Sequence, residues 1–358
     1  MVLEKRIKTV SIWCGVFVFL LSIGARTAGA ATDPEKILGP AACIDCHKAE
    51  YQTLMSMKHQ KAFDGAPDFE PLQRQPAAQA ILDKLGLRSV KREPCTTCHF
   101  TMQAEGARPK AIAGVSCESC HGAAKEWRGV HNDYGTDAKR EKATRETELP
   151  DHRTMRLEQS EKLGMIRPNQ PYFVAENCFQ CHTVPNEELV NKGGHTAGSA
   201  FELVSWAQGE VRHNFLLSNG TENREAPKAL NPAHHTRVLY IIGRMLDLEY
   251  SLRAAARATQ DGPYIDAMKQ RTVAVVDRLK EIQAHAPILA PIIGEIVNAA
   301  ATARLQSNNQ AELIAAVDRV KTAAKKFVAA NYDGSQFAAL DALIPDAKQY
   351  KGKVSDGK

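Results

Sequence analysis

The sequence predicts a mainly α-helical protein of two domains behind a short targeting segment. From about residue 231 the chain lacks cysteine and becomes alanine-rich, with apolar residues at helical spacing. Before that point it contains all nine cysteines and many glycine, proline and asparagine turns. The 358 residues also exceed what one hydrophobic core usually organises, since single cores stop growing near about 250 to 300 residues. We therefore expect two differently built halves.

The first thirty residues have the pattern of a secretory signal peptide. A basic start is followed by an apolar run over 10–23 and by small residues at 28–30, which predicts cleavage near Ala30. The run is shorter than the roughly 18 residues that a membrane-spanning helix needs. We expect export to the periplasm and no membrane span after cleavage, with a retained signal anchor as the alternative.

The net charge argues against one class of partner. It is +5 for the whole chain and falls to +2 when residues 1–30 are removed, because Lys5, Arg6, Lys8, Arg26 and Glu4 leave with them. So small an excess is not that of a nucleic-acid-binding protein.

Eight of the nine cysteines form four Cys-x-x-Cys pairs, and histidine follows each pair. Chance predicts far fewer than one such motif. Two cysteines three positions apart on a helical turn reach both vinyl groups of a haem, and the next residue turns under the plane as the proximal iron ligand. We expect four covalently bound haem c groups. The motifs attach them through Cys43, Cys46, Cys95, Cys98, Cys117, Cys120, Cys178 and Cys181, with proximal ligands His47, His99, His121 and His182.

Three other interpretations of the pairs stay open. Zinc binds four thiolates from such pairs, but it leaves four adjacent histidines unexplained and suits an intracellular protein better. A disulfide within each pair would close a short, strained loop, and a thioredoxin-like redox pair would occur once.

Eight further histidines could supply the second axial ligands. His59 lies twelve residues beyond His47 in a segment, 48–63, that is expected to be helical, hence about 18 Å along the axis. Two histidines so far apart do not bind one iron, so His59 is expected to ligate a different haem. The same argument applies to His131, ten residues after His121.

The region 39–215 resembles the tetrahaem cytochrome c-554 family. The most specific stretch runs from Gly114 through the third motif to Gly122 and on to Trp127-Arg128-Gly129 and His131. Lys58-His59-Gln-Lys-Ala-Phe63 is similar to the family's distal ligand segment. A weaker match runs from Phe201 to His213, on what looks like an amphipathic helix.

The resemblance implies a set of ligand pairs. His131 would face His47, His213 would face His121, and His59 would face His182, which leaves the haem on His99 five-coordinate. In the family this open iron is associated with small ligands such as nitric oxide. His195 has no counterpart in the family pattern and could close the site. The other histidines are expected to be surface or loop residues, namely His152, His234, His235 and His285.

The expected domains follow from these patterns. Aromatic residues make up only 6% of the chain, so haems would fill much of the core of a tetrahaem domain over 31–225 with few strands. An antiparallel four-helix bundle is expected over 226–345, with helices from Pro232, Pro263, Pro287 and Asn309. A flexible, lysine-rich tail is expected over 346–358.

The function expected first is electron transfer between redox proteins, because bis-histidine iron has no free position for a substrate. The resemblance suggests hydroxylamine oxidation or related respiration as its setting. The alternative is an enzyme that reduces nitric oxide or a similar molecule at an open haem on His99. A haem-based sensor would need an output domain, for which the bundle has no signalling motif. The bundle could also form a homo-oligomer.

Overall fold

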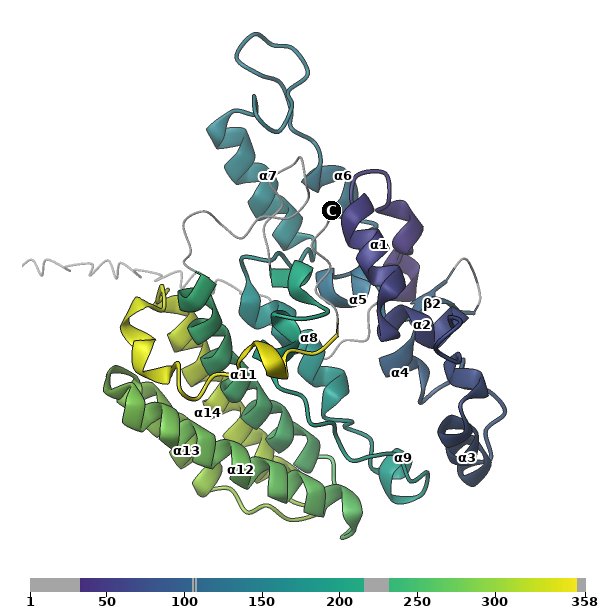
Figure 1. Cartoon of the computed structure of the whole chain (residues 1–358), viewed down its shortest axis with the longest axis vertical. Helices are drawn as coiled ribbons and strands as arrows, with labels where there is room; N and C mark the ends of the chain where they lie inside the picture. Colours follow the sequence, from purple (N-terminus) through teal and green to yellow (C-terminus); the bar gives the residue numbers. More distant parts are fainter. Residues whose placement is uncertain (1–32, 105, 107, 216–231, 353–358) are drawn as a thin grey trace, which may run out of the picture. The chain divides into compact units, whose positions relative to one another are not determined.

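The computed structural model describes residues 33–104, 106, 108–215 and 232–352. The expected signal peptide over 1–30 lies outside these residues, as does most of the stretch around the expected domain boundary. Within them the protein is mainly helical, which confirms the predicted fold class (Figure 1). The strands that the structure describes form one two-stranded sheet.

The part before residue 216 consists of short elements. In chain order they are η1 Pro34–Lys36, η2 Pro40–Ala42, α1 Lys48–Ser56, α2 Lys58–Asp64, η3 Leu72–Arg74, α3 Pro76–Leu85, α4 Thr96–His99, β1 Thr101–Gln103, β2 Lys110–Ala113, α5 Cys117–His121, α6 Arg128–His131, α7 Pro150–Lys162, α8 Pro171–His182, α9 Glu187–Asn191, α10 Leu203–Ala207 and η4 Arg212–Phe215. Three attachment histidines end a helix, at α4, α5 and α8, and His47 lies at the N-cap of α1.

The prediction of a single helix over 48–63 is wrong, because the helix is interrupted at Met57. This residue has an extended backbone, with φ −76° and ψ 148°, and its side chain is buried in the main hydrophobic cluster. The Ser56 hydroxyl donates to the Thr53 carbonyl at 2.7 Å, a local bond that competes with continuation of the helix. The break sends α2, which carries His59, in a new direction.

The small sheet connects the second and third motifs to α2. Strand β1 pairs antiparallel with β2, with Thr101 opposite Ala113 and an irregularity after it. Directly beyond β2, the Val115 amide donates to the His59 carbonyl at 3.2 Å. Any side chain at Gly114 would collide with that same carbonyl, because a Cβ there would lie 2.1 Å from it. A glycine is therefore required where the sheet meets α2.

The predicted four-helix bundle is present. It consists of α11 Pro232–Ala255, α12 Pro263–His285, α13 Ala290–Ala301 and α14 Gln310–Ala329, with a short 3-10 turn η5 Pro287–Leu289 before α13. Helix α11 packs against α12 and α14, and α13 packs against both of these (Figure 1). Leu246, Leu279, Ile296 and Val317, one from each helix, are fully buried. The apolar residues at helical spacing thus form the core.

One hydrophobic cluster joins the bundle to the fourth attachment motif. Helix α8 packs on α11 and contributes Tyr172 and Phe179 to the same cluster. The Tyr172 hydroxyl donates to the fully buried Glu249 carboxylate of α11 at 2.8 Å. By contrast, a separate cluster beside the second motif has only four buried members, Leu82, Val90, Cys95 and Phe100. A domain boundary near 225 stays a prediction, and the core runs across it.

Part of the expected flexible tail is packed on the protein. After η6 Ser335–Leu340 and η7 Ala347–Gln349, the Lys351 amide donates to the Ser205 carbonyl at 2.9 Å. Its carbonyl accepts from the Glu210 amide at 2.8 Å. These paired backbone groups hold residues 346–352 near α10, whereas 353–358 lie outside the described residues.

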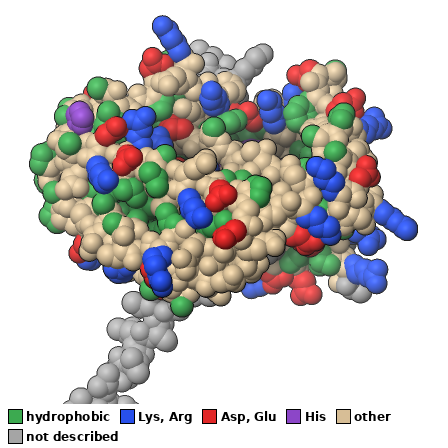
Figure 2. Space-filling view, turned by 90° about the horizontal axis from the view of Figure 1, so that it is seen from below, with side chains coloured by type: hydrophobic (Ala, Val, Ile, Leu, Met, Phe, Trp, Pro, Cys, Tyr) green, Lys and Arg blue, Asp and Glu red, His purple; other side chains and the backbone are tan. Residues whose placement is uncertain are grey.

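The surface carries charges of both signs. Figure 2 shows lysine and arginine interspersed with aspartate and glutamate on the face seen from below. Elsewhere among the described residues, oppositely charged side chains form exposed ion pairs, such as Lys326 with Glu295 at 2.8 Å. Across the described ranges, no helix combines the length and apolar character needed to cross a membrane.

We expect Ile296→Ala to lower the free energy of unfolding by about 3 kcal/mol, because the removed side chain is fully buried between α13 and α14. Guanidinium unfolding followed by far-UV circular dichroism measures this. The control is Val273→Ala on α12, where the side chain is 56% exposed, and its effect should stay within about 0.5 kcal/mol. Equal losses in the two variants would contradict the described core.

Candidate haem sites

The four motifs lie next to one another in a definite order. The Cys43 thiol of the first motif lies close enough to the Cys117 thiol of the third for each to shift the pKa of the other. The Cys98 thiol of the second contacts the Cys181 thiol of the fourth. The third and fourth are joined because α5 packs on α8 and the Asn177 side chain donates to the Cys120 carbonyl at 2.9 Å. These contacts link the first motif to the third, the third to the fourth, and the fourth to the second.

Three attachment histidines each face a histidine from another segment. The rings of His47 and His131 are stacked with centroids 6.4 Å apart. The rings of His182 and His59 are 6.2 Å apart, and those of His99 and His195 are 6.5 Å apart.

This spacing fits one iron atom between two imidazoles. A metal takes a histidine nitrogen at about 2 Å, and the ring centre lies about 1.2 Å behind that nitrogen, so two rings on opposite sides of one iron have centroids about 6.4 Å apart. A donor for a haem carboxylate is also present, because the buried indole Nε1 of Trp127 has no hydrogen-bond partner among the described residues. Its ring contacts that of His131 at 5.2 Å. The residues present thus fit haem.

The partners of the Nδ1 atoms leave Nε2 available for a metal. Nδ1 of His131 lies 2.6 Å from the Arg128 carbonyl, and Nδ1 of His182 lies 2.9 Å from the Ser199 hydroxyl. With the proton on Nδ1, the lone pair of Nε2 is free for iron, as in other metal-binding histidines. Burial lowers the pKa of His99 and of His182 to about 4. Both rings are then neutral at pH 7, which a metal ligand must be.

The third motif differs from the other three. Nδ1 of His121 lies 3.0 Å from the Ile166 carbonyl, and Nε2 lies 3.1 Å from the Asn214 side-chain oxygen. The resemblance implied His213 at this place, and that pairing stays a prediction. His213 is the neighbour of Asn214 in η4. The amphipathic helix expected from Phe201 to His213 is instead the short α10 followed by this 3-10 turn.

A buried carboxylate inside the third motif was missed by the sequence reasoning. Glu118, between the two cysteines, is 2% exposed. It accepts hydrogen bonds from the amides of Leu38, Gly39 and Ala124 at 2.7 to 3.2 Å. Three amide donors replace the water that the carboxylate loses on burial. Glu118 thereby fastens the segment before the first motif to the third motif, and a charged residue inside an attachment motif was its sequence signal.

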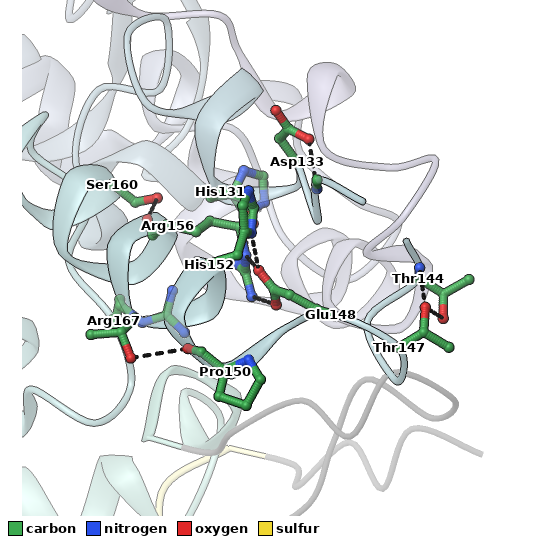
Figure 3. Close-up of polar contacts among 12 residues, drawn as sticks. His131, Asp133, Thr144, Thr147, Glu148, Pro150, His152, Arg156, Ser160 and Arg167 are labelled. Atoms are coloured by element: carbon green, nitrogen blue, oxygen red, sulfur yellow. Dashed lines mark hydrogen bonds and ion pairs between the residues drawn. The ribbon is translucent and has the colours of Figure 1, made fainter. Parts of the chain in front are cut away.

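A second carboxylate positions the segment that carries His131. Glu148 is bound by the Arg156 guanidinium through two bonds of 2.7 Å each, and by the His152 ring at 2.8 Å (Figure 3). Arg156 also donates to the His131 carbonyl at 2.6 Å. The pair is almost inaccessible to solvent, with Glu148 at 1% and Arg156 at 9% exposure. His152 therefore belongs to this ion-pair network, and Arg156 links it to the backbone of α6.

The remaining three histidines lie on the bundle helices. His234 and His235 are in the first turn of α11, and His285 ends α12, where its Nδ1 lies 2.9 Å from the Glu281 carbonyl.

Comparison with known proteins agrees with the motifs. Residues 42–122 match the family described as "Cytochrome c554 and c-prime". The chain is also 26% identical to cytochrome c-554 of Nitrosomonas europaea over 183 residues, which cover 48% of this chain and 68% of that protein. No solved structure matches.

Glu148→Gln should lower the free energy of unfolding by about 2 kcal/mol at pH 7, because the charge that pairs with Arg156 is lost. The hydrogen bonds from Arg156 lower the pKa of Glu148 below its ordinary 4.5. A lowered carboxyl pKa stabilises the folded protein above the unfolded pKa, and this gain disappears as pH falls through the folded pKa. The difference between wild type and variant should therefore shrink below about pH 4.5.

The matched control is Glu158→Gln on α7, the helix that carries Arg156, where an exposed pair with Lys162 at 3.8 Å should contribute within about 0.5 kcal/mol. Denaturant unfolding from pH 3 to pH 7 measures both variants. A loss at Glu148 that is independent of pH would be inconsistent with a stabilising ion pair.

Proposed function

We propose that this chain is a tetrahaem electron carrier of the cytochrome c-554 family, whose model matches residues 42–122 and of which it has a 26% identical relative. The assignment makes it a c-type cytochrome with covalently bound haem c that takes part in electron transfer. The four Cys-x-x-Cys-His motifs support a count of four haems, each attached by the two cysteines of its motif.

The paired histidines carry this proposal. His47 with His131, and His182 with His59, are spaced for one iron each, and both members of a pair are held by separate segments. An iron ligated on both faces changes its oxidation state without offering a position to a substrate. Such a site suits a carrier better than an enzyme.

The order of the motifs supports a route through the protein. When bound, each haem supplies an iron that takes up and releases one electron. The contacts between motifs support an arrangement of the sites in series, from the first through the third and the fourth to the second. Redox partners would then exchange electrons at the two ends of this series, beside His47 and beside His99.

The cellular location and the pathway are proposed from the sequence and from the family. The signal-peptide pattern over 1–30 supports export to the periplasm. The family suggests hydroxylamine oxidation or a related respiratory pathway. A homo-oligomer formed through the bundle stays a prediction.

Mass spectrometry and redox titration of the exported holoprotein test the proposal, with four attached haems and four one-electron reductions expected. We expect His131→Ala and His59→Ala each to convert about one quarter of the iron from low spin to high spin, because each removes one axial ligand. Low-temperature electron paramagnetic resonance of the oxidised protein measures the conversion.

His285→Ala is the control. His285 is the last residue of α12, and its ring bonds to the Glu281 carbonyl of the same helix. Its spectrum should equal that of the wild type. Fewer than four haems, or unchanged spectra of both ligand variants, would overturn the proposal.

A further inference from the structure

We propose that His195 is the second axial ligand of the iron held by His99, and that the turn between α11 and α12 positions it there. This inference rests on the proposed function and deepens it. The resemblance to the family implies an open iron on His99, so the structure assigns this chain a different ligand set at that site.

The ring separation is the first observation. The His99 and His195 rings are 6.5 Å apart, against 6.4 Å and 6.2 Å in the other two pairs. The planes of His99 and His195 are inclined by 49°. Rotation about an iron–nitrogen bond changes this inclination without changing the separation, so the separation is the property to compare.

The second observation is the orientation of the His195 ring. Its Nδ1 lies 2.8 Å from the Thr196 carbonyl, which accepts a hydrogen bond when Nδ1 carries the proton. The lone pair of Nε2 is then available on the far side of the ring. A bond from Nδ1 to a backbone carbonyl is the usual second contact of an iron-binding or zinc-binding histidine.

The chain around His195 is shaped to bring it to His99. Helix α9 ends in a turn where the amides of Gly194 and His195 donate to the carbonyls of Val190 and Leu189, both at 3.1 Å. Gly194 has a φ of +78°, which favours glycine. A Cβ at Gly193 would lie 2.6 Å from the Leu189 carbonyl. Two successive glycines are therefore needed to reverse the chain directly before the histidine.

The connection between α11 and α12 of the bundle also binds α9. At the start of α9, the Glu187 carboxylate accepts from the amides of Thr259 and Gln260 at 3.0 to 3.2 Å. At its end, the Asn191 side-chain oxygen accepts from the Tyr264 amide, in the first turn of α12, at 2.9 Å. Helix α9 is thus fixed at both ends to the connection between α11 and α12. Glu187 and Asn191 are positioning residues for His195.

A ligand on both faces of this iron has a functional consequence. With His195 bound, the His99 site has no free position for nitric oxide or a similar small molecule. The protein would then lack the open iron that the reductase alternative requires, and the second motif would serve as one end of the electron route.

Electron paramagnetic resonance of the oxidised holoprotein, with and without added nitric oxide, tests the ligand. The wild type should be entirely low spin at the His99 iron and inert to nitric oxide. We expect His195→Ala to make about one quarter of the iron high spin and able to bind nitric oxide, with added imidazole restoring low spin. His285→Ala should behave as the wild type.

A high-spin quarter in the wild type that His195→Ala leaves unchanged would overturn the inference. That result is distinct from failure of the proposed function, because haem content and the one-electron reductions are measured on the same samples. Four haems with an open His99 iron refute only the ligand, whereas fewer than four refute the tetrahaem carrier.

The positioning role needs variants that keep His195. Glu187→Ala and Asn191→Ala should each raise the high-spin fraction, but by less than His195→Ala does. Added imidazole should reverse the change. The matched control is Glu188→Ala, whose exposed side chain lies 3.4 Å from Lys192 on the same helix. Low-spin spectra in all three variants, alongside a high-spin His195→Ala, would refute the positioning role.

Discussion

Across residues 33–215, the fold brings three attachment histidines to within 6.2 to 6.5 Å, between ring centroids, of a second histidine, a separation that suits one iron. The partner of each paired attachment histidine comes from a different segment: α6 for His47, α2 for His182 and the turn after α9 for His99. Each partner has its own local support, which is Arg156 for α6, the Val115 amide for His59 and the double glycine for His195. The small side-chain cluster near the second motif would not by itself specify this arrangement.

The fourth attachment helix unites the redox part with the bundle. One end of α8 carries His182, while Tyr172 and Phe179 are buried with the bundle helices. The polar contact between α8 and α11 is also buried. The Glu249 carboxylate is fully buried and accepts hydrogen bonds from the Tyr172 hydroxyl and from the Arg253 guanidinium. Buried polar groups with complete partners favour a single arrangement of the elements that carry them. A displacement of the bundle would therefore disturb the fourth site.

Local patterns predicted local structure well. The alanine-rich periodicity predicted the four bundle helices, and the spacing argument separated His59 from His47 although the helix between them is broken at Met57. The position of Asn214 against His121 was not predictable, because the two residues are 93 positions apart in the sequence and only the folded chain brings them together. The same holds for Glu118, because two of its three amide donors, those of Leu38 and Gly39, lie about eighty residues away. For His195, the sequence left its role open, and only the folded turn brings it opposite His99.

The hydrogen bonds that fix α9 to the connection between α11 and α12 have a consequence for how the sequences of such proteins diverge. Glu187 and Asn191 bind mainly to backbone amides at 259, 260 and 264, and every amino acid except proline supplies such an amide. Selection on these contacts therefore falls mainly on Glu187 and Asn191, while on the bundle side the Thr259 hydroxyl is the side-chain group that also donates to Glu187. Correlated substitutions between α9 and this connection are accordingly not expected, and sequence covariation alone would overlook a contact that the backbone maintains.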